Sequence, residues 1–567
     1  MSNLIESARQ QVSALTQAAY EKAAQAGALP AGAAIAAKVD IPKDTSFGDY
    51  ASSFAMAAAK PLGMAPRAIA QALLDHLDLT GSYFDSAAIA GPGFLNLTLG
   101  HNWFAQVLSD VESEGPLYGQ SDEGRGEKVM VEFVSANPTG LMTIGNARGG
   151  VLGDALASIL QRLGYDVWRE FYVNDAGNQV DKFARSLEVR YIQHFKGEDA
   201  MEFPEDGYHG ADIGELANEF ADEFGDRYLE VSTEERQAAL REYGLAHNIA
   251  RMKVDLERYN IHYDQWFLES SLHDSGYVAE TVAILEQGGH TYEKDGAVWL
   301  KNTDFGADKD EVLRRSNGFY TYYAVDVAYH RDKFLKRGFD RVIDVWGADH
   351  HGHALRFAAT MKAPSLGLAD KRLDFLLMQL VELLQDGKEV KVSKRSGKAI
   401  TLSDLLDEIG VDAARFFFNG SKPTSHLIFD MDLAVRQDSD NPVYYVQYAH
   451  ARICSLTAKL AAEEGQSVPA AADVDAALLK SPEELALLKT LARFPEEIRL
   501  AGRDYDPSQI DRYLVGLAGD FHRFYNAQRI KGEAPALLKA RLKLADATRS
   551  VLKNGLDLIG VTAPEKM

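Results

Sequence analysis

The feature that most constrains the fold of this chain is a strand, a glycine-rich turn, a helix and a second strand in succession between residues 128 and 173. The first strand is the apolar run VMVEFV at 129–134, and glycines follow at positions 140, 145, 149 and 150. Apolar residues from Val151 to Leu163 recur at helical spacing, and Gly164 ends that helix. The segment YDVWREFYV at 165–173 has the pattern of the second strand. Such a unit predicts a parallel sheet with a nucleotide site at the carboxyl ends of its strands.

The length of the chain, 567 residues, is too great for one hydrophobic core, so several domains are expected. We predict a multi-domain α/β protein. Its Rossmann-like parallel-sheet catalytic domain spans 119–430 and contains an inserted, mostly helical segment at about 180–265. An N-terminal α+β domain (1–118) precedes it, and a C-terminal all-helical bundle (431–567) follows.

Local patterns predict individual elements within these domains. Helical periodicity predicts helices at 4–26 and 65–77, and FLNLTL at 94–99 predicts a strand. Strands are also expected at 319–329 and 341–346, followed by a hairpin at 378–392 that turns at Asp386-Gly387. After residue 403 the chain is expected to be almost entirely helical.

Composition and charge argue against a membrane or secreted protein, and weakly against a nucleic-acid-binding one. No apolar run approaches the ~20 residues of a membrane-spanning helix, and the N-terminus has no pattern of a secretion signal. The single cysteine, Cys454, cannot form an internal disulfide, which fits a reducing cytoplasm, and its apolar neighbours favour a small core residue. The net charge of −23 argues weakly against nucleic acid, because a large chain can bind RNA through local basic patches.

Two motifs carry the chemistry. The first, SANPTGLMTIGN at 135–146, lies between the first strand and its helix, where backbone N–H groups at a helix N-terminus and the missing side chain of Gly145 let a phosphate approach. The second, KVSKRSGK at 391–398, places several cations beside a serine and a glycine, which suits a triphosphate. Either motif alone is weak evidence, since tight turns and solvated basic loops are common.

Together the two motifs, in this order and about 250 residues apart, resemble the HIGH and KMSKR signatures of class I aminoacyl-tRNA synthetases. The rest of the chain, from about residue 40 to 567, is similar to bacterial-type arginyl-tRNA synthetases. The segments that carry this similarity are FGDYASSFAM at 47–56, AGPGFLNL at 90–97, SANPTG at 135–140, YVNDAGNQV at 172–180, FPEDGYHG at 203–210, TYYAVDVAYH at 321–330, DVWGADHHGH at 344–353, NPVYYVQYAHAR at 441–452, FHRFYNAQR at 521–529 and GVTAPEKM at 560–567.

The first signature departs from that family. Thr143 and Asn146 stand where the family usually has histidines, a pattern also seen as TIGN in some tryptophanyl-tRNA synthetases. Both side chains can donate hydrogen bonds to phosphate oxygens, but neither can bring a positive charge. The second signature keeps both lysines.

The resemblance implies an ATP-dependent arginine–tRNA ligase, which uses ATP with Mg²⁺ to make arginyl-adenylate and then transfers arginine to the 2′-OH of the terminal adenosine of its tRNA. It implies catalytic roles for Thr143, Asn146, Lys391 and Lys394, and ATP binding by Gly145, Gly347, Asp349, His350 and Ser393.

The arginine pocket is implied by one oddity and by the resemblance. Glu132 is an acid in an otherwise apolar strand, where a charge is costly unless it is paired. Carboxylates bind a guanidinium bidentately. By resemblance, the residues lining the pocket would be Glu132, Ser135, Asn137, Tyr322 and Asp326.

The resemblance also implies tRNA contacts. Phe94 and Asn96 match the pair that reads a base at the tRNA elbow, since an aromatic face with an amide edge suits an unstacked base. Tyr445, Tyr448, Arg452 and the terminal Met567 match the anticodon contacts, although Tyr445 and Tyr448 share a helix face and could simply pack there.

Several alternatives remain open. His350, His351 and His353 could suggest a metal, but their segment resembles the ATP-binding strand end, so no structural metal is expected. A synthetase-like protein that does not charge tRNA, a nucleotidyltransferase without RNA and a ligase for another amino acid are the competing functions. With arginine, ATP and tRNA as partners and no membrane, we expect a cytoplasmic monomer.

Overall fold

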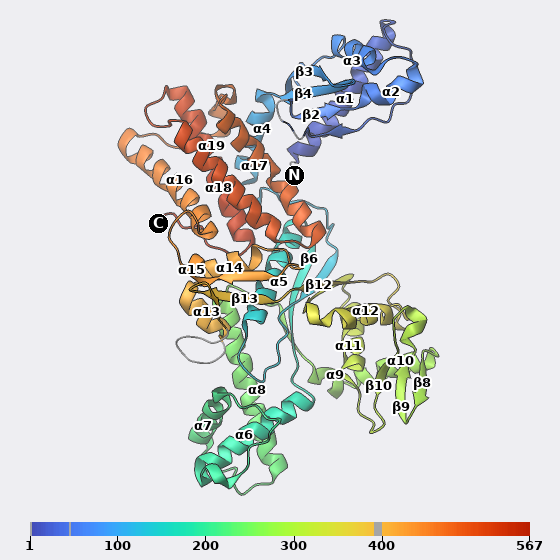
Figure 1. Ribbon diagram of the computed structural model, residues 1–567, viewed down its shortest axis with the longest axis vertical. Helices are drawn as coiled ribbons and strands as arrows, with labels where there is room; N and C mark the ends of the chain where they lie inside the picture. Colours follow the sequence, from blue (N-terminus) through green and yellow to red (C-terminus); the bar gives the residue numbers. More distant parts are fainter. Residues whose placement is uncertain (1–2, 43, 45–46, 391–399) are drawn as a thin grey trace.

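The computed structural model describes residues 3–42, 44, 47–390 and 400–567. The molecule is elongated, with a small domain and a helical bundle on one side of a central sheet and two lobes on the other (Figure 1). This is the predicted multi-domain α/β architecture. Within the described part of the chain, no helix combines the length and apolar character needed to cross a membrane.

The N-terminal domain is an antiparallel sheet covered by helices. The sheet has the order β1 (Val39–Asp40), β2 (Tyr50–Ser52), β4 (Phe94–Leu99), β3 (Phe84–Ala90). The helices α1 (Leu4–Gln25), α2 (Phe54–Leu62) and α3 (Pro66–Asp75) pack on it, which confirms both predicted helices and the strand at 94–99. The next helix, α4 (His101–Glu114), instead packs on α17 (Pro482–Asp504) and α19 (Pro535–Leu558), which are helices of the bundle.

The central sheet is parallel throughout, as predicted. Its order is β12 (Arg372–Met378), β11 (Arg341–Gly347), β5 (Lys128–Glu132), β6 (Asp166–Val173), β7 (Gln265–Leu268). The chain builds outward from β5 to β7, then returns to β11 on the other side of β5. The strand order therefore reverses between β5 and β11, and in open α/β sheets ligands bind outside the carboxyl ends of the strands at such a point.

The helix after the first strand, α5 (Ile144–Arg162), lies very close to the sheet. A Cβ atom on Gly153 would lie 2.2 Å from Cγ of the Phe133 ring, and one on Gly150 would lie 2.8 Å from Cδ1 of Ile261. A larger side chain at position 153 would collide with the base of the Phe133 side chain, and one at position 150 would displace the end of the Ile261 side chain. The helix glycines thus allow α5 to pack closely against Phe133, which directly follows β5.

Two lobes extend from the sheet. The first consists of α6 (Asn178–Lys196), α7 (Ala211–Phe224) and α8 (Thr233–Arg258), has a small core of its own, and confirms the helical insertion. The second, which the sequence did not predict, contains α9 (Ser270–Asp274), α10 (Tyr277–Gln287), the antiparallel strands β8 (Thr291–Lys294), β9 (Ala297–Leu300) and β10 (Glu311–Arg314), and α11 (Tyr322–Arg331).

The strand predicted at 319–329 is wrong, because that segment forms α11. Its aromatic and β-branched residues favour a strand locally, but the side chain of Thr321 accepts a hydrogen bond from Ala324 N and caps a helix. Packing of buried Tyr323, Val327 and Ala328 on one face then overrides the local preference. A π-helical turn, Asp332–Lys336, continues α11.

The second half of the chain begins with the predicted strand at 341–346, seen as β11, followed by the short 3₁₀ turn Ala348–His350 and α12 (His351–Thr360). The predicted hairpin is β13 (Val381–Gln385) and β14 (Lys388–Glu389), and its turn residues Asp386 and Gly387 both have the positive φ of a tight hairpin turn. Beyond it, β15 (Leu427–Asp430) pairs with β13 in parallel. The other elements of this half are α13 (Leu402–Ile409), α14 (Val411–Asn419), α15 (Met431–Ala434), α16 (Pro442–Glu464), α17, α18 (Ser508–Ala527) and α19.

Candidate active site

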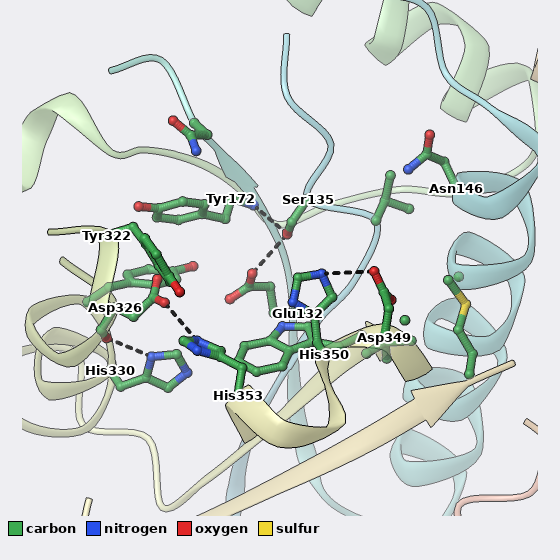
Figure 2. A pocket seen from close by; sticks show the side chains of 18 residues that line it. Glu132, Ser135, Asn146, Tyr172, Tyr322, Asp326, His330, Asp349, His350 and His353 are labelled. Carbon is green, nitrogen blue, oxygen red and sulfur yellow. Dashed lines mark hydrogen bonds and ion pairs between the residues drawn. The ribbon is translucent and has the colours of Figure 1, made fainter. Parts of the chain in front are cut away.

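A cavity of about 450 Å³ opens at the carboxyl ends of the sheet strands, where the strand order reverses. Its walls come from the ends of β5, β6, β11 and β12, the first turns of α5 and α12, and one face of α11 (Figure 2). The polar residues that line it are Glu132, Ser135, Asn146, Tyr172, Asn174, Tyr322, Asp326, Tyr329, His330, Asp349, His350 and His353.

The structure brings many of the predicted site residues to this one cavity. In the sequence, these residues are spread over more than 200 positions, from Glu132 to His350. Those that line it are Glu132, Ser135, Asn146, Tyr322, Asp326, Gly347, Asp349 and His350. Asn137 and Gly145 are exposed outside its lining, and Thr143 lines a neighbouring pocket. Lys391, Ser393 and Lys394 lie outside the described residues.

The turn after β5 is strained, and the strain aims side chains into the cavity. Val134 and Ser135 have φ of 69° and 42°, and a positive φ is rare for a β-branched residue such as valine. The Ser135 hydroxyl donates to Oε1 of Glu132 at 2.9 Å and accepts from the backbone N–H of Tyr172 at 3.1 Å. The unusual backbone thus links the end of β5 to β6 and fixes one oxygen of Glu132.

Glu132 is buried and belongs to a charged cluster. Its Oε2 accepts from Nζ of Lys333 at 2.5 Å, and the same Nζ donates to Oδ1 of Asp344 at 3.2 Å. Nε2 of His330 lies 2.8 Å from Oδ2 of Asp344. Burial raises the pKa of Glu132 while Lys333 lowers it, and for Asp344 the attraction of Lys333 and His330 holds the pKa below its usual value despite burial. Lys333, which the sequence did not mark, therefore offsets part of the cost of this buried acid, and the pKa of Glu132 stays above its usual value because of burial.

A second carboxylate faces the cavity from α11. Oδ2 of Asp326 lies 3.2 Å from Nε2 of His353, and the backbone carbonyl of Asp326 lies 2.9 Å from Nδ1 of His330. Tyr322, one turn earlier, is 68% exposed at the mouth, with its ring tilted against His353. Glu132 and Asp326 thus place two carboxylates in this part of the cavity, and the Tyr322 ring lies at its entrance. Together they can bind the end of a cationic side chain.

The opposite wall is the N-terminus of α5. Oδ1 of Asn146 accepts from the backbone N–H of Thr143 at 2.8 Å and from its hydroxyl at 3.0 Å, forming a capping box. The Asn146 amide nitrogen makes no hydrogen bond to any other described residue and can donate to a ligand. With the remaining backbone N–H groups of the first turn, this wall suits an anion such as phosphate.

The end of β11 forms the third wall. Gly347 precedes the 3₁₀ turn that carries Asp349 and His350, whose side chains lie 3.7 Å apart and are largely exposed. The Trp346 ring packs against His353 with a centroid distance of 5.4 Å. This wall combines flat rings, a glycine and a carboxylate, groups that can bind a base and a ribose. Among the residues that the structure describes, no group of three or more His, Cys, Asp or Glu side chains is placed to hold a metal ion.

The residues expected to contact tRNA lie far from the cavity, at two other places. Phe94 is half-buried, and buried Asn96 donates to the carbonyl of Phe47 at 2.7 Å, while its Oδ1 has no hydrogen-bond partner among the described residues. Phe47 itself is exposed. These groups give the N-terminal domain an aromatic face beside an amide.

On the bundle, α16 and α18 bring aromatic and cationic groups together. The guanidinium of Arg452 lies over the Tyr525 ring at 4.4 Å and near that of Tyr448 at 5.4 Å. Tyr445 packs on His522 at 4.7 Å, so part of its surface serves helix packing. Met567 is exposed and lines a separate pocket on this side of the molecule. Cys454 was predicted to be a core residue, but it is only half-buried at the edge of the bundle core, and partial burial raises the pKa of its thiol.

Sequence reasoning missed Lys333, His330 and Asp344, which complete the charged cluster. Lys333 lies among other charged residues in the segment HRDKFLKRG, so nothing marks it as buried. Asp344 could have been found, because it is an acid in the apolar strand RVIDVW, the same signal that marked Glu132.

Three family models match the chain. The arginyl tRNA synthetase N terminal domain matches residues 8–99, the catalytic domain of class I (R) tRNA synthetases matches 107–425, and the DALR anticodon binding domain matches 446–567. Together they cover all three of the regions just described.

Individual relatives match over the whole length. The arginine–tRNA ligase of Acetivibrio thermocellus is 51% identical over 567 residues, and that of Ruminiclostridium cellulolyticum is 49% identical over 567 residues, each covering 100% of both chains. Among solved structures, Thermus thermophilus arginyl-tRNA synthetase is 25% identical with a TM-score of 0.69, covering 98% of this chain and 99% of that one.

Proposed function

The chain belongs to the arginyl-tRNA synthetase family of class I enzymes, and we propose that it is an arginine–tRNA ligase whose active site is the cavity at the ends of β5 and β11. The observation that carries the substrate assignment is Glu132, a buried carboxylate in the cavity wall, with Asp326 in the same wall. A guanidinium is the cation whose geometry best matches carboxylates at fixed positions.

The proposed reaction has two steps. A carboxylate oxygen of arginine attacks the α-phosphorus of ATP, which is taken up as its Mg²⁺ complex, and pyrophosphate leaves. The 2′-OH of the terminal tRNA adenosine then attacks the carbonyl carbon of the adenylate, and AMP leaves. Both steps depend on positioning and on neutralising charge, and neither needs a protein nucleophile.

The walls of the cavity support a division of roles. Glu132, held by Ser135, and Asp326 would bind the guanidinium, with Tyr322 closing over it from the mouth. The Asn146 amide and the N–H groups of α5 would bind phosphate oxygens, and Thr143 would hold Asn146 in place.

The remaining roles belong to the nucleotide and to the second signature. Gly347, Asp349 and His350 would contact the adenosine. Lys391, Ser393 and Lys394 would supply the positive charge that Thr143 and Asn146 cannot, a role that rests on the sequence motif.

Recognition of tRNA would use the two surfaces outside the cavity. Phe94 and Asn96, whose Oδ1 has no partner within the described part of the chain, would read an elbow base by stacking and hydrogen bonding. Tyr445, Tyr448, Arg452 and Met567 would contact the anticodon arm. We further propose that the protein acts as a monomer in the cytoplasm.

The decisive experiment is aminoacylation of bulk tRNA with each of the twenty labelled amino acids, using the full chain, ATP and Mg²⁺. Arginine alone should be attached. Attachment of a different amino acid would overturn the substrate, and no attachment together with no tRNA-stimulated pyrophosphate exchange would favour the non-catalytic relative.

A further inference from the structure

A fully buried lysine, Lys333, lies directly behind the cavity wall. The Lys333 side chain has no solvent exposure and is not among the cavity-lining residues. Its Nζ lies 2.5 Å from Oε2 of Glu132 and 3.2 Å from Oδ1 of Asp344. A lysine without access to water carries a large desolvation cost, which only charged partners of this quality offset. Glu132 binds the guanidinium in the proposed function, but that function assigns no role to Lys333.

The local backbone places Lys333 in this position. It lies in the π-helical turn that continues α11, and π turns inside helices are often found at functional sites. Nζ also lies 4.2 Å from the centre of the Tyr329 ring and 3.4 Å from Nε2 of His330. The ammonium group is therefore enclosed by two acids, one imidazole and one aromatic face, and it has little freedom to move.

Glu132 in turn faces titratable groups from every element around it. Lys333, His330 and Tyr329 come from α11 and its π turn, and Asp344 comes from β11. Tyr172 comes from β6, and Tyr263 comes from the segment before β7. Burial and the neighbouring charge of Asp344 raise the pKa of Glu132, and Lys333 is the largest influence that lowers it. Without Lys333 the carboxyl group would sit beside a second acid in a dry site, which favours its protonated form.

We propose that Lys333 is a positioning residue for the amino-acid substrate: it holds Oε2 of Glu132 so that this carboxylate stays charged and presents Oε1 to the incoming guanidinium. The proposal rests on the assignment of arginine as substrate. Oε1 already accepts from Ser135 and, as a carboxylate oxygen, has a further lone pair for a guanidinium N–H. Asp344 balances the charge of Lys333, so the charge of Glu132 is not cancelled when arginine is absent.

The test is the arginine KM of Lys333→Met as a function of pH, measured in the complete charging reaction. The arginine KM of the variant should rise about tenfold or more near pH 7, because the fraction of charged Glu132 falls. The ratio of variant KM to parent KM should then decrease as the pH rises above about 7, since rising pH restores the carboxylate. The KM for ATP should not change, because the nucleotide wall is separate.

Two further variants separate positioning from a merely structural role. Lys336→Met removes a lysine from the same turn that pairs with Asp332 and lies over Tyr277, and it should behave like the parent at every pH. Lys333→Met combined with Asp344→Asn removes the second acid as well, so Glu132 regains part of its charge. The arginine KM of this double variant near pH 7 should lie below that of Lys333→Met, and the double variant also relieves the buried repulsion if the single variant folds poorly.

Different failures have different meanings. A folded Lys333→Met variant with the parental arginine KM, or a KM ratio that is the same at all pH values, overturns the proposal. Equal rises in the KM values for arginine and ATP would mean a general disturbance and would overturn it too. If the parent protein itself does not charge arginine in the same assay, the proposed function fails instead.

Discussion

The two ends of the cavity differ in how their charged side chains are buried and paired. At the end where we propose that arginine binds, the Glu132 side chain is 8% exposed and its partner Lys333 is fully buried, so charge is fixed in a dry cluster. At the end where we propose that the nucleotide binds, the side chains of Asp349 and His350 are 77% and 57% exposed, and the first turn of α5 offers neutral donors. The Glu132 end is held by a buried ion pair, and the Asp349 end is open to water.

The difference follows from what each end must do. Distinguishing one amino acid from nineteen others depends on strong electrostatic interactions, which require a low local dielectric. A hydrated nucleotide with its own metal ion needs positioned donors and cations that act when charge develops on the phosphates. The contrast predicts that substitutions at the two ends will separate into effects on arginine and effects on phosphate transfer.

The largest expected effect concerns the second signature. Because Thr143 and Asn146 bring no positive charge, we expect Lys394→Ala to slow adenylate formation by about 10²–10³, as for removal of one positioned charge-stabilising donor. The KM values for arginine and ATP should change much less. Single-turnover formation of arginyl-adenylate with tRNA present measures this, and a parental rate would mean that the second signature has no catalytic role here.

The next effect tests the arginine end. Glu132→Gln keeps the shape of the side chain but removes its charge from Lys333 and from the guanidinium. Loss of a charge-assisted pair of about 1.5–3 kcal/mol should lower kcat/KM for arginine by roughly 10- to 100-fold. The KM for ATP serves as the internal control, and an equal change in both would indicate damage to the fold rather than to the pocket.

A pair of substitutions at Asn146 sharpens the contrast at the phosphate end. Asn146→Asp keeps the oxygen that accepts from Thr143 and so keeps the helix cap, but it replaces the free amide with a negative charge. We expect a roughly tenfold loss in the rate of adenylate formation from electrostatic repulsion of phosphate. Asn146→Ala loses the cap and the donor but adds no charge.

The two Asn146 variants should therefore rank in opposite order in two measurements. Asn146→Ala should slow adenylate formation less than Asn146→Asp, yet it should melt at a lower temperature, because a lost cap costs about 1 kcal/mol. If both variants were equally slow and equally stable, Asn146 would act neither as a cap nor on phosphate.

The same contrast explains what the sequence could predict. The strand–turn–helix–strand unit predicted the parallel sheet and the position of the cavity, because short-range patterns determine both. Glu132 was visible because an acid in an apolar strand must have a partner. Exposed groups such as Asp349 and His350 were identified through their resemblance to a known motif, since a charged residue on a surface gives no signal of its own.

The buried partner was harder to predict for a physical reason. Lys333 is about 200 residues from Glu132 in the sequence, and the segment that carries it was predicted to follow a strand. The cap at Thr321 and the tertiary packing of Tyr323 and Val327 make that segment a helix, and the π turn directs Lys333 inward. The cap signal of Thr321 was present and would have predicted the helix, but not the direction of the lysine.

The smallest expected effect concerns the strained turn that joins the arginine end to the sheet. Ser135 has a φ of 42° and donates to Oε1 of Glu132, so strain and hydrogen bond occur at one residue. Ser135→Ala keeps the strain and loses the bond, whereas Ser135→Gly loses both. The hydroxyl acts on arginine only through Glu132, so loss of this hydrogen bond should raise the arginine KM by about three- to tenfold in each variant, without a change in the KM for ATP. Ser135→Gly should melt at a higher temperature than Ser135→Ala, because glycine adopts this φ without steric cost.

If the hydroxyl is what positions Glu132, the two variants will share one arginine KM despite their different stabilities. If the strained backbone is what positions it, only Ser135→Gly will show the rise.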